Sequence, residues 1–265
     1  MAELIPGFKF LGTLDDLTAY KTKQSDKVIL KRKWGPSREM INNKPNYAIT
    51  RKNIKDFGGA STAASAVKRA MGVMPKVPDY YFFGNLTSLM KVVEAKDTVS
   101  PIGKRHVQLS KYPQLLEGLQ ISKRNLFESQ VHNPIVCNLS RQDCSADLTL
   151  PALLPGVNFF GIGDFQYYYW RIDLGIVPDM FYKENAKHAP YNNYPFNFRK
   201  TIISEWFHVN QPAVAANLQI AMDSLPPDND YSLMLTVAIH FGKVESSGEI
   251  KFVDYAVAGR VMRVL

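Results

Sequence analysis

The sequence predicts an α+β protein that is predominantly β. An N-terminal β-hairpin arm and a helical segment precede an antiparallel β-sandwich or jelly-roll-like domain. Three patterns indicate this: a hairpin-like start, helical spacing of apolar residues in the middle, and period-two alternation through most of the remainder. The predicted boundaries are 1–44 for the extended basic arm, 45–117 for the helical segment and 118–265 for the β domain.

The arm is predicted as a two-stranded hairpin within residues 7–35. Its strands cover residues 14–23 and 27–34, with a turn at residues 24–26. A two-stranded ribbon is marginal by itself in water, so we expect it to dock on another surface. Its apolar residues are the candidate assembly contacts, namely Leu14, Leu17, Tyr20, Val28, Leu30 and Trp34.

The middle segment carries helical periodicity. A break is predicted at Gly58-Gly59, after which small and apolar residues follow the i, i+3, i+4, i+7 spacing of a buried stripe. Small side chains there favour the close approach of another backbone. The candidate helix-packing residues are Ala60, Ala63, Ala64, Val67, Ala70 and Met71. Further helices are predicted over residues 80–96 and around residues 105–116.

The last segment alternates between apolar and other residues. Long strands are predicted over residues 168–176, 233–241 and 255–265, and shorter ones over residues 119–121, 135–139, 148–150, 203–207 and 218–222. Turns rich in Pro, Gly and Asn separate them, as in antiparallel sandwiches. His208 and His240 fall opposite apolar faces, so we expect them to face solvent or to form hydrogen bonds.

Positive charge is concentrated at the start of the chain. The net charge is +8, and residues 1–76 hold 11 Lys and 4 Arg against 6 acidic residues, so the remaining chain is nearly balanced. Such asymmetry indicates a nucleic-acid, membrane or acidic-partner contact. The candidates are Lys21, Lys23, Lys27, Lys31, Arg32, Lys33, Arg51, Lys52, Lys55, Lys68 and Arg69. Strand alternation divides the arm's charge between two faces, which favours docking on protein over wrapping nucleic acid.

No catalytic motif is recognisable, and the sequence predicts no catalytic residue, cofactor, metal site or small-molecule substrate. Carboxylates that could work as acid and base are present without informative spacing, namely Asp173, Asp179, Glu184 and Glu205. Cys137 and Cys144 have neither redox nor zinc spacing. We expect two reduced, half-buried thiols, with a cross-strand disulfide as the alternative.

An aromatic loop is a candidate interface. Its polar-tipped and apolar rings, Tyr191, Tyr194, Phe196 and Phe198, are of the kind enriched at protein–protein interfaces. Exposed aromatic rings are also typical of carbohydrate-binding modules, which is a weaker alternative.

The N-terminal motif Gly12-Thr-Leu14, Leu17-Thr18, Tyr20-Lys-Thr-Lys23 resembles the opening of a family of uncharacterised proteins from Bacteroidetes. The Ala-rich helical segment ending at Lys68-Arg69 is similar to that family as well. Asp15-Asp16 stands where members usually have Gly-Gly. The resemblance implies the order arm, helices, β domain, and it brings no activity or catalytic residues.

These patterns favour a non-enzymatic structural subunit, a homo-oligomer that self-assembles into a filament, tube or shell through its arm and helices. A nucleic-acid-binding protein, or a viral capsid or virion protein with its basic third on a genome, is the alternative. No apolar run reaches the roughly 20 residues of a membrane span. The first residues lack the features of a secretory signal, which predicts cytoplasmic synthesis and leaves the final location open, cell-associated or in a virion.

Overall fold

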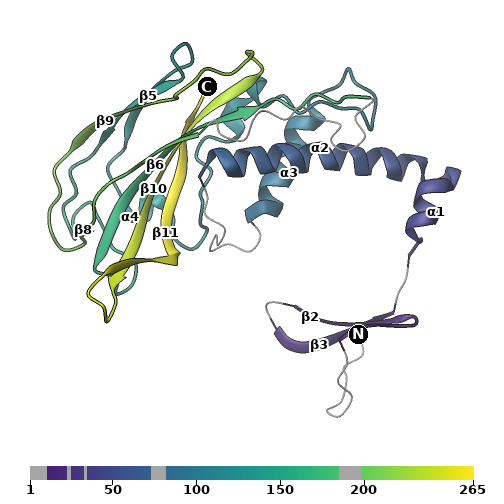
Figure 1. The fold of residues 1–265 in the computed structure, drawn as a ribbon, viewed down its shortest axis with the longest axis horizontal. Coiled ribbons are helices and arrows are strands. Elements are labelled where there is room, and N and C mark those ends of the chain that lie inside the picture. Colours follow the sequence, from purple (N-terminus) through teal and green to yellow (C-terminus); the bar gives the residue numbers. More distant parts are fainter. Residues whose placement is uncertain (1–10, 23–24, 33–34, 73–81, 185–198) are drawn as a thin grey trace. The chain divides into compact units, whose positions relative to one another are not determined.

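A computed structural model describes residues 11–22, 25–32, 35–72, 82–184 and 199–265 of the chain (Figure 1). The chain divides into two compact units, Met1–Arg51 and Lys52–Leu265, which are considered separately. The fold is α+β and predominantly β, with antiparallel sheets and an N-terminal hairpin, as the sequence predicts.

The first unit contains a three-stranded sheet, called the arm sheet below, of β1 (Gly12–Leu14), β2 (Leu17–Thr22) and β3 (Ser25–Arg32). The predicted hairpin lies between β2 and β3, but a two-residue turn at Asp15-Asp16 interrupts its first strand. Asp15 has a φ of 51°, and Asp tolerates this left-handed conformation better than most residues do. The pair therefore adds a third strand, where a two-stranded ribbon is predicted.

Two short helices follow the arm sheet, α1 (Arg38–Asn43) and the 3₁₀ helix η1 (Pro45–Tyr47). The Ser37 hydroxyl caps α1 by accepting a hydrogen bond from the backbone N–H of Met40 at 3.1 Å.

The long helix α2 (Ala48–Ala70) runs through Gly58-Gly59 without a break, so the predicted interruption is wrong. Each glycine costs a helix about 1 kcal/mol relative to alanine, a cost that burial of the following turns can outweigh. α3 (Phe82–Ala95) lies where a helix is predicted. The helix predicted near residues 105–116 is instead two 3₁₀ turns, η2 (Leu109–Lys111) and η3 (Pro113–Leu115), because proline lacks the N–H that a continuous helix needs.

The second unit is built on a five-stranded antiparallel sheet with the order β11-β10-β6-β7, in which β8 also pairs with β6. Its strands are β6 (Tyr167–Pro178), β7 (Arg199–Ile203), β8 (Phe207–His208), β10 (Tyr231–Val244) and β11 (Ile250–Val264). The three long strands match the long strands predicted from alternation. The predicted strand at residues 119–121 is only a bridged segment, in which the Ile121 N–H donates to Gly259 O on β11 at 2.7 Å.

A three-stranded sheet covers one face of this five-stranded sheet. It consists of β4 (Val136–Ser140), β5 (Ser145–Leu150) and β9 (Ala216–Ala221), and the short helix α4 (Phe127–Gln130) adds to the core. The predicted apolar sides of β6 and β10 fill the space between the two sheets, with residues such as Trp170, Ile172 and Val237. This arrangement is a β-sandwich.

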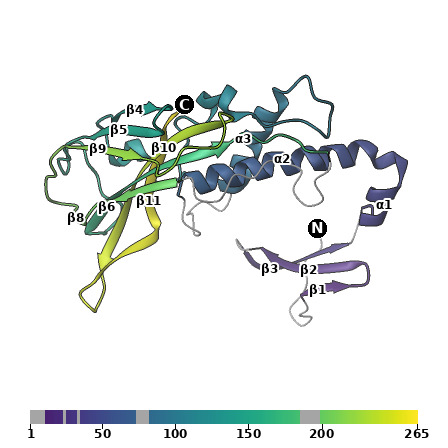
Figure 2. The same ribbon diagram turned by 45° about the horizontal axis from the view of Figure 1, so that its top comes forward.

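Helices α2 and α3 lie on the other side of the five-stranded sheet (Figures 1 and 2). β6 and β10 are therefore buried on both faces along most of their length. A Cβ on Gly175 of β6 would lie 2.4 Å from the Ala70 carbonyl oxygen, so the C-terminal end of α2 sits directly on this strand. A Cβ on Gly72 would likewise lie 2.2 Å from Oδ1 of the buried Asp173 carboxylate.

Register shifts occur between β10 and β11, at Leu235/Thr236 and at His240/Gly242. They break the strict alternation predicted for residues 255–265. Val261 and Val264, which are three residues apart, both join the helix-side core, while Met262 packs on the sandwich core. A bulge changes the face of every residue beyond it, which is why alternation alone misplaces them. No helix among the described residues is long and apolar enough to span a membrane.

Candidate functional site

The arm sheet gathers most of its apolar residues on one face. Cross-strand pairs place Leu14 opposite Leu17, and Ala19 opposite Leu30, with Val28 two residues before Leu30 on the same face. We call Leu14, Leu17, Ala19, Val28 and Leu30 the arm face. Leu14 and Leu17 are 60% and 38% exposed, and Ala19 is the one buried residue among those described in the first unit. The arm face is therefore apolar, and its exposed part is the end formed by Leu14 and Leu17.

The remaining assembly candidates fall elsewhere. Tyr20 pairs with Ile29 on the opposite face of the arm sheet and is exposed. Trp34 lies outside the described residues, as do Lys23 and Lys33 and the candidate interface loop with Tyr191, Tyr194, Phe196 and Phe198.

Some predicted basic contacts of the first unit lie on the surface of the arm sheet, and another, Arg51, binds backbone carbonyl groups. Arg32 pairs across from Leu17 on the arm face, 3.8 Å from Asp16, while Lys31 pairs with Thr18 on the other face. The Arg51 guanidinium donates to the carbonyl oxygens of Ile41 and Lys44, at 2.7 and 2.9 Å. Arg51 thus closes the C-terminal end of α1. Lys21 and Lys27 are exposed on β2 and β3.

The six helix-packing candidates are all buried in the core between α2, α3 and the sheet: Ala60, Ala63, Ala64, Val67, Ala70 and Met71. The close backbone approach expected of small residues occurs within the chain, where Ala70 lies on Gly175. These residues are not on the surface, so a contact between copies through α2 would have to use its other sides.

A buried ionic group lies on the helix side of β6, where the sequence shows only alternation. The Arg171 side chain donates two hydrogen bonds to Asp173, from Nε at 2.7 Å and from a terminal nitrogen at 3.2 Å. Thr201 on β7 donates to the same carboxylate at 2.6 Å. Arg171 is 8% and Asp173 2% exposed, and Arg199 Nε approaches Asp173 to 3.7 Å. This polar cluster lies beside the C-terminal end of α2.

Aromatic rings continue the polar cluster along the sheet. The His240 ring stacks on Tyr169 with centroids 5.0 Å apart, and Trp206 meets Tyr169 edge-on at 4.7 Å. Burial lowers the pKa of His240 to about 4, and the positive charge of Arg171 acts in the same direction. His240 is 9% exposed and therefore does not face solvent, contrary to one of the two expectations, because the rings of Tyr169 and Phe252 pack around it.

The depressed pKa of His240 makes stability depend on pH. Between about pH 6.5 and pH 4, unfolded chains bind a proton at His240 that folded chains do not, so the folded state loses stability as the pH falls. The loss attributable to this residue is about 3 kcal/mol over that range. We expect His240→Gln to lose less stability than the wild type between pH 7 and about pH 4.5, measured by urea unfolding. An identical loss in both proteins would contradict the buried neutral histidine.

A basic pocket opens beside the polar cluster. It has a volume of about 510 Å³ and is lined by Ser65, Lys68 and Arg69 of α2, Phe83 of α3 and Arg199 of β7. The Arg199 guanidinium donates to the carbonyl oxygen of Arg69 at 3.2 Å, which joins β7 to the end of the helix. Two of the predicted basic contacts, Lys68 and Arg69, thus meet a third cation from a distant part of the sequence.

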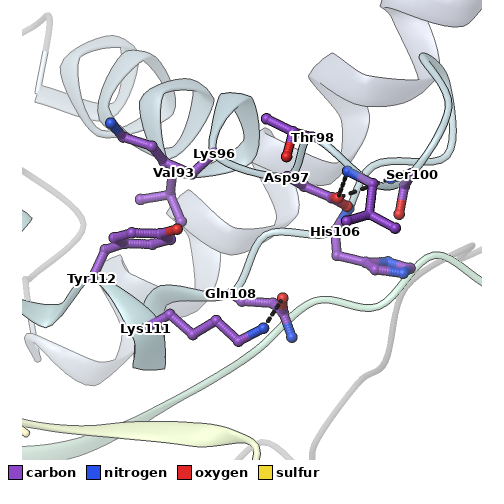
Figure 3. Close-up of a pocket in the computed structure, with 10 residues that line it drawn as sticks. Val93, Lys96, Asp97, Thr98, Ser100, His106, Gln108, Lys111 and Tyr112 are labelled. Atoms are coloured by element: carbon purple, nitrogen blue, oxygen red, sulfur yellow. Dashed lines mark hydrogen bonds between the residues drawn. The ribbon is translucent and has the colours of Figure 1, made fainter.

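A second pocket, of about 290 Å³, lies between the end of α3 and the loop after it (Figure 3). Asp97 organises this loop by accepting hydrogen bonds from the backbone N–H groups of Val99, Ser100 and His106, at 3.1, 2.9 and 2.8 Å. Burial opposes its ionisation, but these donors outweigh burial and lower the pKa of Asp97 to about 2. His106 Nδ1 accepts from the Tyr182 N–H at 3.0 Å. The polar groups here hold the loop together.

Three of the four carboxylates considered as acid–base candidates are engaged with separate partners. Asp173 is bound to Arg171, Asp179 accepts from Ser110, and Glu184 pairs with Lys104. Within the described ranges, no three His, Cys, Asp or Glu side chains are grouped so as to hold a metal ion. Cys137 and Cys144 are both free thiols, and Cys144 is fully buried with its Sγ 3.3 Å from the Tyr231 hydroxyl.

Phe83, Arg171 and Arg199 were missed as site residues by sequence reasoning. Arg171 and Asp173, two residues apart on an otherwise apolar strand, are the one signal that could have located the polar cluster, since same-face neighbours two apart can pair. Nothing in the sequence indicates that Arg199 reaches Arg69, which is 130 residues away.

The described residues thus define a predominantly β, α+β protein in which one antiparallel sheet is covered by helices on one face and by a second sheet on the other. Comparison with protein-family models, curated proteins and solved structures found no match for the chain. The resemblance to the Bacteroidetes family therefore stays a prediction from the N-terminal motif.

Proposed function

We propose that this chain is a non-enzymatic structural subunit that self-associates through its arm sheet. The observation that carries the proposal is the arm face, where Leu14 and Leu17 are exposed in a unit with one buried residue among those described. Burying apolar surface contributes about 25 cal/mol per Å², so covering this face is favourable. Arg171 and Asp173 of the second unit are buried and hydrogen-bonded to each other, and His240 is buried against the Tyr169 ring, which supports a structural role.

The occupant we propose for the arm face is the same face of a second copy. Its rim carries both signs, since Arg32 lies 3.8 Å from Asp16. Because these two charges balance each other, a second copy meets no net charge at this part of the rim, whereas a strongly charged partner would gain nothing there. The edge of β3 is less suited to pairing, because Lys27 and Lys31 lie on that strand and edge lysines oppose strand addition.

Deletion of residues 1–35 tests the proposal. The shortened chain should be smaller in light scattering than the assembled full chain, and it should keep cooperative unfolding, because both hydrophobic cores belong to the second unit. A finer variant replaces Leu14 and Leu17 by serine, with Leu154→Ser and Leu225→Ser as the matched control at exposed leucines of the second unit. Only the first pair should weaken assembly. Unchanged assembly after the deletion would refute the proposal.

A further inference from the structure

The three-stranded sheet of the sandwich has an open edge at β9 (Figures 1 and 2). The N–H of Met222, the residue after β9, donates to the Cys144 carbonyl oxygen at 3.0 Å. Residues along an antiparallel ladder alternate between directing both backbone groups at their neighbour and directing both away, so those of Asn217, Gln219 and Ala221 point away from β5. No other described strand pairs with β9, so these outward N–H and C=O groups have no ladder partner.

The β9 edge lacks the features that normally keep sheet edges from pairing with other chains. Edge strands of soluble proteins usually carry charged residues, proline or a bulge. β9 has none of these, and no residue from 209 to 222 is charged. The edges of the five-stranded sheet differ, because β7 carries Arg199 and Lys200. The other edge, β11, is bridged at Arg260 by Gln120. The β9 edge is therefore suited to accept a further strand.

The other edge of the three-stranded sheet, β4, offers fewer backbone groups. By the same alternation only Cys137 and Leu139 of β4 direct their N–H and C=O groups outward. β9 has three such residues, and their side chains are exposed on the outer face of the sheet. The longer run of outward groups makes β9 the better site for strand addition.

A second copy of β9 fits this edge in one antiparallel register. When a two-fold axis passes through Gln219, this residue faces its symmetry mate, and Asn217 of one copy faces Ala221 of the other. Every outward N–H of these three residues then lies opposite an outward C=O of the second copy. On the inner side, Leu218 faces Ile220 of the other copy, and both residues belong to the sandwich core, which the pairing would extend.

The charges around this edge favour a second copy over a charged peptide. Gln219 can face another glutamine because its amide group both donates and accepts hydrogen bonds. Asp147, the one charged residue of β5, lies beside Gln219 and is separated from its symmetry mate by two β9 strands. At about 4.8 Å between strands this separation is about 14 Å, which exceeds the Debye length of about 8 Å. The pairing therefore brings no like charges together, although the chain has a net charge of +8.

We propose that β9 pairs antiparallel with β9 of a second copy, with the two-fold axis at Gln219. The two three-stranded sheets then join into one continuous sheet. The contact uses residues of the second unit only, so it is independent of the arm face. One two-fold contact per chain produces a dimer, whereas a second contact of this kind allows dimers to join into a larger assembly.

Cysteine substitution tests the register. The Gln219→Cys thiols would lie directly across the two-fold axis, with Cα atoms about 5.5 Å apart, which is within the range of a disulfide. After mild oxidation of the full chain with copper phenanthroline, we expect a disulfide-linked dimer of about twice the 29.9 kDa monomer mass on a non-reducing gel. The wild type measures the background from its two free thiols, Cys137 and Cys144.

Asn217→Cys and Ala221→Cys are the matched controls, since both positions are exposed on the same face of β9. Each lies about 14 Å from its own symmetry mate in the proposed register, so neither variant alone should crosslink above the background. An equimolar mixture of the two should crosslink, because Asn217 faces Ala221. Equal crosslinking by all three single variants, or none by Gln219→Cys, would overturn the proposal.

Gln219→Lys separates this contact from the arm face. It places like charges directly opposite each other between copies, which destabilises strand pairing, whereas within one chain the new ammonium lies beside Asp147. In a full chain that also carries Leu14→Ser and Leu17→Ser, we expect it to weaken the remaining self-association at least about fivefold in sedimentation velocity. If the arm face plays no part in assembly, this loss should still occur.

Asn138→Lys is the matched control for Gln219→Lys. Asn138 is exposed on β4 and lies beside Asp147 on the other side, so the added charge meets the same neighbour away from the β9 edge. This variant should self-associate as the parent chain does. Equal weakening by both lysine variants would show that only net charge matters, and the proposed pairing would be wrong.

Discussion

Replacing Asp173 by alanine should destabilise the second unit by about 3–5 kcal/mol. The substitution leaves the Arg171 guanidinium, which is 8% exposed, without the carboxylate that accepts both of its hydrogen bonds. It also removes the acceptor of the Thr201 hydroxyl. An uncompensated charge in the interior is costly because water no longer solvates it. Urea unfolding at neutral pH measures the change in the free energy of unfolding.

The matched control is Asp223→Ala. Asp223 forms an ion pair with Lys200 of β7, but its side chain is 80% exposed. Exposed pairs contribute roughly 0–1 kcal/mol, so this variant should be close to the wild type. Equal effects of the two substitutions would contradict the buried ion pair. Replacing both Arg171 and Asp173 by apolar residues of similar size should restore much of the stability lost in Asp173→Ala, since no charge then stays buried alone.

Gly175→Val should destabilise the same unit by about 3 kcal/mol or more, at the upper end of overpacking effects. A side chain at this position meets the backbone of Ala70, with its carbonyl oxygen 2.4 Å and its Cα 2.6 Å from the first added carbon. Backbone cannot rotate away as the end of a flexible side chain can, so α2 must move off the sheet. The expected result is a lower urea midpoint.

Gly58→Ala is the control for Gly175→Val. A Cβ at Gly58 meets nothing within 4 Å, and the residue lies inside the continuous helix α2. Alanine is favoured over glycine there by roughly 0.5–1 kcal/mol, so this variant should be slightly more stable than the wild type. If Gly175→Val were tolerated as well as Gly58→Ala, the close packing of α2 on β6 would be wrong.

Period-two alternation was sufficient to predict the long strands, because a strand with one face in a sandwich core must alternate. Trp170, Ile172 and Leu174 do point into that core. Alternation could not show that the other face is buried too, since charged residues such as Arg171 and Asp173 are typical of a solvent-facing surface. In the structure these two side chains are buried and hydrogen-bonded to each other. The covering helices lie in another part of the sequence.

The helix break predicted at Gly58-Gly59 is wrong because the prediction rests on local helix preference alone. Glycine lowers helix propensity, but buried positions such as Gly59 and Ala63 fix the helix through packing that the local sequence does not display. The turn at Asp15-Asp16 was missed for a related reason, since Asp is only an occasional substitute for Gly at positive φ.

The candidate site was harder to predict than the strands, because it is formed by residues that are distant in the sequence. Lys68 and Arg69 were predicted as basic contacts from the charge of the first third of the chain. Phe83 and Arg199 come to the same pocket only because α3 and β7 both meet the end of α2. Such convergence of separate elements is a property of the tertiary fold, and no spacing in the sequence encodes it.

The measurement that bears most directly on self-association is sedimentation velocity of the full chain over a range of concentrations at neutral pH. The monomer has a mass of 29.9 kDa. We expect a species larger than this, with a proportion that rises with concentration and falls when Leu14 and Leu17 are replaced by serine. A single 29.9 kDa species at every concentration would contradict the proposed role as a self-associating subunit.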